Sequence, residues 1–187
     1  MYNSLGDFMK QIFKYALKLF GNLVFAWFAS ITLVISFSVI FAKASKWVFY
    51  LFLQSFSFIL LIVLVWNTLY NIGFKDSNMV RIGRQREDLY RGFKIGALAQ
   101  MPALAFLIVS IIFNFKFAIY RLLNSSYYWF LTAIAGKDEY MRMGSVKIIG
   151  IALLLLIVPA ISGTVYILGY KGIDLFSKLV YKKSKEK

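Results

Sequence analysis

Four long stretches of this chain carry no charged side chain, and this pattern constrains the fold more than any other feature. A helix of about 20 apolar residues can cross a hydrocarbon core roughly 30 Å thick. The composition also favours lipid, because 60% of the residues are hydrophobic and only 16% are charged. We therefore predict an all-α, polytopic transmembrane bundle that forms a single integral membrane domain over residues 1–187. The four predicted spans cover about 20–42, 48–70, 95–115 and 148–170.

A charged connector, residues 71–94, separates the first pair of predicted spans from the second pair. Its first half is rich in turn-forming residues, so we expect the second span to end before them. Between Gly83 and Gly92 the spacing predicts a short surface helix, in which Arg84 and Asp88 lie four residues apart and form an ion pair. The turn formers are Asn71, Gly73, Asp76, Ser77 and Asn78.

Two segments outside the predicted spans have the pattern of helices that lie along a membrane surface. Residues 4–19 repeat apolar residues at the helical period, while Lys10, Lys14 and Lys18 fall on the opposite face. We expect this segment to be retained and not cleaved as a signal peptide. Residues 116–146 combine interfacial aromatic residues with scattered polar ones, which predicts one or two surface helices. A short or re-entrant span over 117–135 remains open as an alternative.

The distribution of lysine and arginine predicts the orientation. These residues concentrate in the N-terminal segment, in the connector and in the tail 171–187, which four spans would place on one side of the membrane. The positive-inside rule then predicts a multi-pass protein of the cell membrane with both termini and the connector in the cytoplasm. Anionic lipid headgroups account for the net charge of +14, so we do not expect nucleic acid as a partner.

Several chemistries lack the residues that they need. Cysteine and histidine are both absent, which removes the commonest metal ligands and the commonest general base. None of the four uncharged stretches holds an acid, which weighs against a proton-coupled pump. Glu87 and Asp88 form an acidic pair, but the surrounding arginines favour ion pairing over magnesium binding. We therefore expect no cofactor and no metal site, and an enzymatic function is less favoured than a non-enzymatic one.

Two sets of residues are candidates for binding. The first set consists of charged residues of the connector, which could contact a protein partner or lipid headgroups on the cytoplasmic face. The second set consists of polar or amphipathic residues inside the spans, which could line a solute site. The connector set is Lys75, Asp76, Arg81, Arg84, Arg86, Glu87, Asp88 and Arg91. The intramembrane set is Trp66, Asn67, Gln100 and Asn114.

Three functions are compatible with these residues. The first is a non-enzymatic membrane subunit that docks a partner through its connector and amphipathic segments. The second is a small-solute transport or substrate-binding subunit, suggested by the helix breakers Pro102 and Pro159 in the last two spans. The third is a lipid-modifying enzyme, in which connector arginines would hold a phosphate headgroup beside Glu87 or Asp88. We rank them in this order.

Overall fold

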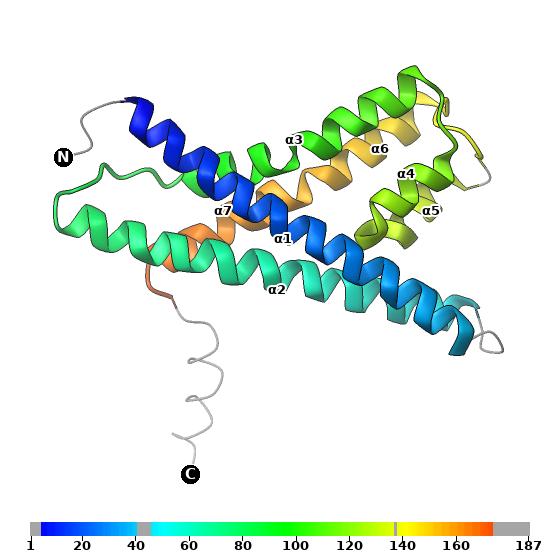
Figure 1. Ribbon diagram of the computed structural model, residues 1–187, viewed down its shortest axis with the longest axis horizontal. Coiled ribbons are helices and arrows are strands. Elements are labelled where there is room, and N and C mark those ends of the chain that lie inside the picture. The colour runs from blue at the N-terminus through cyan, green and yellow to red at the C-terminus, as the bar shows by residue number, and fades with distance from the viewer. Residues whose placement is uncertain (1–4, 41–45, 137, 174–187) are drawn as a thin grey trace, which may run out of the picture.

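The computed structural model describes residues 5–40, 46–136 and 138–173 (Figure 1). Most of the predicted basic tail, from residue 174 on, lies outside the described residues, as do residues 41–45 between the first two predicted spans. Within the described ranges, every regular element is a helix. The helices are α1 (Leu5–Ile40), α2 (Lys46–Arg81), α3 (Arg91–Ile112), α4 (Phe117–Leu123), the 3-10 turn η1 (Ser125–Tyr127), α5 (Tyr128–Ala135), α6 (Ser145–Leu155) and α7 (Ile157–Tyr170).

The predicted all-α architecture with four candidate spans is confirmed for the described residues. Four helical segments are long and apolar enough to cross a membrane: Phe8–Phe37, Ser55–Arg81, Arg91–Ile112 and Ser145–Tyr170. The first two belong to helices of 36 residues each, which are about 54 Å long at 1.5 Å per residue. Both helices therefore exceed the roughly 30 Å that a span requires.

The separate surface helix predicted over residues 4–19 is wrong. This segment is the beginning of α1 and continues into the first candidate span without a break. Its amphipathic character was predicted correctly, because Ile12 and Ala16 are buried while Lys10 and Lys14 are exposed. No proline interrupts residues 5–40, and Gly21 alone is too weak a breaker to end the helix.

The prediction for the connector is also wrong in both halves. The turn formers lie inside α2, which continues to Arg81, and residues 82–90 form an irregular loop in place of a short helix. Gly83 ends α2 because it adopts a left-handed conformation with φ of 70°. The Gly83 N–H donates to the Val80 carbonyl at 2.9 Å, and the Arg84 N–H donates to the Met79 carbonyl at 2.9 Å. This hydrogen-bond pattern is the Schellman motif, which satisfies the last carbonyls of a helix.

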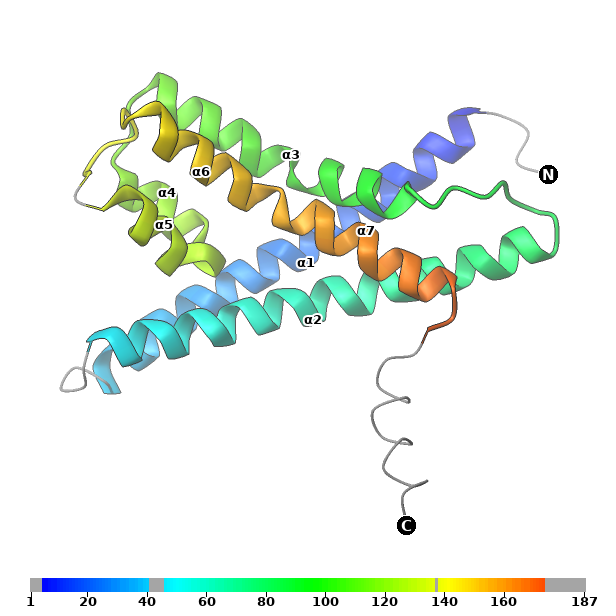
Figure 2. The same cartoon turned by 180° about the vertical axis from the view of Figure 1, so that it is seen from behind.

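Close helix contacts centre on α7, which packs against α2 on one side and α3 on the other (Figure 2). Glycine makes this approach possible, because a Cβ on Gly169 would overlap the carbonyl of Tyr70. Likewise, a Cβ on Gly73 would overlap the carbonyl of Tyr166. Small residues allow helix backbones to approach closely, which is how helices commonly associate in a membrane. Gly73 therefore serves helix packing and not the turn that the sequence predicts.

The last predicted span, 148–170, is a broken helix. The α-helical pattern is interrupted at Leu156, between α6 and α7. Pro159 explains the interruption, because it has no N–H to donate to the carbonyl of Leu155 four residues earlier. The helix then restarts where the Ala160 N–H donates to the Leu156 carbonyl at 3.1 Å.

Helices α4 and α5 form a hairpin that folds back into the bundle. The pair α1–α2 and the pair formed by α3 with α6–α7 lie together at one end and diverge toward the other, and the hairpin fills the opening (Figures 1 and 2). The α4–α5 tip, residues 122–127, contacts α1: the Trp27 indole N–H donates to the Leu122 carbonyl at 2.8 Å, and the Ser125 hydroxyl donates to the Trp27 carbonyl at 3.1 Å. The segment therefore enters and leaves at the same end of the bundle, and its two short helices do not cross the bundle from end to end (Figures 1 and 2).

Candidate functional site

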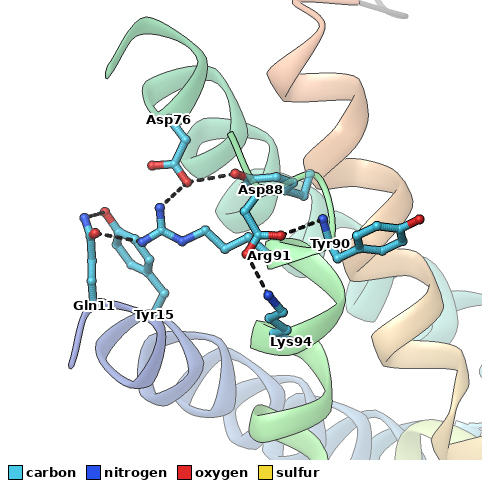
Figure 3. A network of polar contacts seen from close by, with 8 residues as sticks. Gln11, Tyr15, Asp76, Asp88, Tyr90, Arg91 and Lys94 are labelled. Atoms are coloured by element: carbon cyan, nitrogen blue, oxygen red, sulfur yellow. Dashed lines mark hydrogen bonds and ion pairs between the residues drawn. The ribbon is translucent and has the colours of Figure 1, made fainter. Parts of the chain in front are cut away.

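A buried polar cluster joins four helices at the end where the two pairs meet (Figure 3). Arg91, the first residue of α3, donates from Nη1 to Asp76 Oδ2 on α2 at 2.7 Å and from Nη2 to Gln11 Oε1 on α1 at 2.7 Å. The Tyr166 hydroxyl on α7 donates to the same Asp76 oxygen at 2.9 Å. We call Gln11, Asp76, Arg91 and Tyr166 the four-helix clamp.

Aromatic rings from α1 complete the surroundings of the Arg91 guanidinium. Its central carbon lies 5.1 Å from the centroid of the Phe8 ring and 5.5 Å from that of Tyr15, within the range of a cation–π interaction. Arg91 is 0% exposed and Asp76 is 1% exposed. The two side chains therefore pair with each other inside the protein, since a buried ion is stable only when an opposite charge lies in contact with it.

The structure divides the predicted connector set into three groups. Asp76 and Arg91 are buried in the clamp and do not reach the surface. Asp88 is half-buried and accepts from Lys94 Nζ at 2.7 Å and from the Tyr90 N–H at 3.1 Å, in place of the predicted pair with Arg84. The exposed members are Lys75, Arg81, Arg84, Arg86 and Glu87. We call these five residues the exposed cationic face. Because Arg91 is buried, it is not available to hold a phosphate headgroup beside Glu87 or Asp88.

The predicted intramembrane set is not brought together. Trp66 stacks on Tyr70 one turn later, with ring centroids 6.0 Å apart. Asn67 is exposed, and its side-chain oxygen accepts from the Asn71 amide at 3.1 Å. Gln100 lies in the wall of the cavity described below, and the other three residues do not line it.

Asn114, the last member of that set, has a structural role at the end of α3. It adopts a left-handed conformation with φ of 51°, and the Phe115 N–H donates to the Ser110 carbonyl at 3.0 Å. Asparagine tolerates this conformation better than other non-glycine residues, so Asn114 ends α3 as Gly83 ends α2. Its side-chain oxygen also accepts the Arg142 N–H at 3.0 Å, which ties the end of α3 to the chain before α6.

A cavity of about 220 Å³ lies where α1, α3 and the α4–α5 tip meet. Its walls are mostly apolar and aromatic, and the described residues that line it carry no charge. The polar side chains in its wall are Gln100, Asn124, Ser126 and Tyr127. Burial raises the pKa of the Tyr127 phenol, so this hydroxyl stays protonated. The lining residues are Phe20, Leu23, Val24, Trp27, Leu61, Ala99, Gln100, Pro102, Ala103, Phe106, Leu123, Asn124, Ser126, Tyr127 and Val158.

Sequence reasoning missed both the clamp and most of the cavity. The clamp had a signal, because an acid just after one predicted span and an arginine just before the next can face each other across antiparallel helices. The cavity had a weaker signal, the run Asn124–Ser126 between aromatic residues, which the surface-helix interpretation absorbed.

Comparison with protein-family models, with curated proteins and with solved structures found no match. Among the described residues, no group of three or more acidic, histidine or cysteine side chains is placed to hold a metal ion.

Proposed function

We propose that this chain is a non-enzymatic, multi-pass subunit of a membrane assembly that docks a partner through its exposed cationic face. The observation that carries the proposal is the way the four-helix clamp supports this face. Asp76 lies near the end of α2 and Arg91 begins α3, so the 2.7 Å ion pair between them fixes both ends of the segment that presents Arg84 and Arg86. A loop fixed in this way loses little conformational entropy when a partner binds.

The neighbours of the exposed arginines also favour a protein partner. Ile82 is 59% exposed and Tyr90 is 71% exposed, and both lie in the same irregular loop as Arg84 and Arg86. Arginine and tyrosine are residue types enriched at protein–protein interfaces. We place this face and both termini in the cytoplasm, where the excess of lysine and arginine is expected.

The proposed orientation can be tested by labelling single cysteines, because the natural chain contains none. Arg84→Cys on the exposed cationic face should react with a membrane-impermeant thiol reagent only in inverted vesicles. Glu139→Cys, an exposed position in the loop before α6, should react in intact cells. Reversed labelling of the two positions would disprove the orientation, and labelling of both from the same side would disprove four spans.

The docking proposal can be tested by site-specific photocrosslinking from position 84 or 86 in native membranes. We expect one protein to be captured repeatedly from both positions. The double substitution Arg84→Glu/Arg86→Glu should reduce capture from the neighbouring position 82 by at least about tenfold, because like charges at an interface oppose binding.

Lys18→Glu is the matched control for this charge reversal, since Lys18 is an exposed lysine of α1 outside the connector. It should leave capture from position 82 unchanged. Capture that survives the double charge reversal, or no capture from any of the three positions, would refute docking through this face.

A second candidate function is a solute-binding or transport subunit, and the cavity favours it. The cavity lies beside two irregularities, Pro102 within α3 and the break at Leu156 before α7. Discontinuous helices and re-entrant segments that meet inside a bundle commonly build solute sites in transporters. If cells that lack the protein take up small solutes at the same rate as cells that contain it, this candidate function is refuted.

A further inference from the structure

The walls of the cavity determine what kind of molecule it can hold. Four aromatic rings contribute to them: Phe20 and Trp27 from α1, Phe106 from α3 and Tyr127 from η1. The Trp27 ring is fixed in place, because its indole N–H donates to the Leu122 carbonyl at 2.8 Å. Aromatic rings attract other rings in stacked or edge-on arrangements. The cavity therefore favours a flat, ring-containing molecule.

Two polar groups in this wall are still available: the Gln100 amide, and the Tyr127 hydroxyl, which is buried and has no hydrogen-bond partner among the described residues. Gln100 is 8% exposed, and its side chain makes no hydrogen bond to any of the described residues. The other amide in the wall is engaged, because the Asn124 side chain donates to the Tyr120 carbonyl at 3.1 Å. A buried polar group without a partner is unfavourable, so a ligand that hydrogen-bonds Gln100 and Tyr127 would remove this cost.

The charge and size of the cavity narrow the ligand further. A charged molecule would lose its hydration without gaining a counter-charge, because the described lining residues are all neutral. A dry cavity of about 150 Å³ can bind benzene. At about 220 Å³ this cavity has room for a somewhat larger molecule, with one or two rings.

The position of the cavity indicates how such a molecule would arrive. Pro102 lies in the wall and is exposed, so the cavity reaches the surface of the bundle at α3. Under the proposed topology this surface faces lipid chains. An uncharged aromatic molecule partitions readily into a bilayer and could enter from the side.

We infer that the cavity binds a neutral aromatic molecule of one or two rings that hydrogen-bonds to the Gln100 amide. This inference deepens the second candidate function and rests on it for the use of the cavity. It is independent of docking through the exposed cationic face.

The test uses 5-fluoroindole as the probe and the purified full-length chain in detergent, with fluorine NMR as the readout. The wild-type chain should give a saturable bound signal that is distinct from probe dissolved in micelles. Gln100→Leu should weaken binding by about tenfold, because it removes one hydrogen bond and preserves the bulk of the side chain. The anionic analogue 5-fluoroindole-2-carboxylate should give no bound signal.

Two further variants separate the cavity from the rest of the lipid-facing surface. Ala103→Trp should abolish the bound signal by filling the cavity, whereas Ala105→Trp, an exposed position on the same helix, should retain it. Thermal unfolding of each variant establishes that it is folded. The inference is overturned if the wild type gives no saturable signal, if Gln100→Leu binds as tightly as wild type, or if the carboxylate binds equally well. Binding without any effect on uptake would refute the transport function alone, while uptake without binding of the probe class would refute this inference alone.

Discussion

Replacing Arg91 with methionine should lower the free energy of unfolding by about 3–5 kcal/mol, the usual cost of leaving one partner of a buried ion pair without its counter-charge. For a chain of this size, the midpoint of thermal unfolding in detergent should fall by roughly 10 °C. The reason is the position of Asp76, which is 1% exposed and would lose its counter-charge while keeping neutral hydrogen-bond donors such as the Tyr166 hydroxyl. Differential scanning fluorimetry of the purified protein measures this change.

A double substitution separates the role of the charge from the role of packing. Asp76→Leu together with Arg91→Met should recover most of the lost stability, because an apolar pair of similar volume often replaces a buried ion pair without loss. Lys94→Ala is the control, since it breaks the ion pair between Lys94 and Asp88. The Lys94 side chain in this pair is 52% exposed. That change should cost less than about 1 kcal/mol. An Arg91→Met protein as stable as Lys94→Ala would show that the clamp does not hold the helices together.

Gly169→Leu should be at least as damaging, with a loss of about 3 kcal/mol or more. A Cβ at this position would overlap the backbone carbonyl of Tyr70, which cannot rotate away as a side chain could. The backbones of α2 and α7 would have to separate, and the Tyr166 hydroxyl would move away from Asp76. The midpoint of thermal unfolding and the yield of monodisperse protein in detergent measure the effect.

Gly21→Leu is the matched control for this substitution. Gly21 lies within α1, is exposed, and has no atom within 4 Å of the position that a Cβ would take. Leucine has a higher helix propensity than glycine, so this variant should be as stable as wild type or slightly more so. Equal losses at positions 21 and 169 would mean that close approach of α2 and α7 is not what Gly169 provides.

The sequence predicts the four candidate spans because their signal is local. An uncharged apolar run needs only neighbouring residues to be recognised, and its length decides whether it can cross a bilayer. The predicted ends were less accurate. Asp76 was assigned to a turn, yet it lies inside α2, because Arg91 neutralises it from the start of another helix. A partner 15 residues away is not visible in the local pattern.

The candidate site was harder to predict because its residues come from distant parts of the chain. Gln11 and Arg91 are 80 residues apart in sequence, yet Arg91 Nη2 lies 2.7 Å from Gln11 Oε1. Among the four intramembrane candidates, Gln100 and Asn114 are both amides in the same apolar run, but one lies in a cavity wall and the other ends a helix. Residue type indicates that such a side chain needs a partner, whereas the fold decides which partner it finds.

The fixed contacts of this bundle are unevenly distributed along its length. The clamp and the glycine contacts around α7 join the helices at one end, while the diverging end is closed by a hairpin whose tip is held to α1 by hydrogen bonds from Trp27 and Ser125. Thermal opening should therefore begin in one leaflet, with amides of α4 and α5 exchanging with deuterium well before those of α7. A molecule dissolved in that leaflet would therefore meet the end of the bundle that opens first, while the end in the opposite leaflet stays closed.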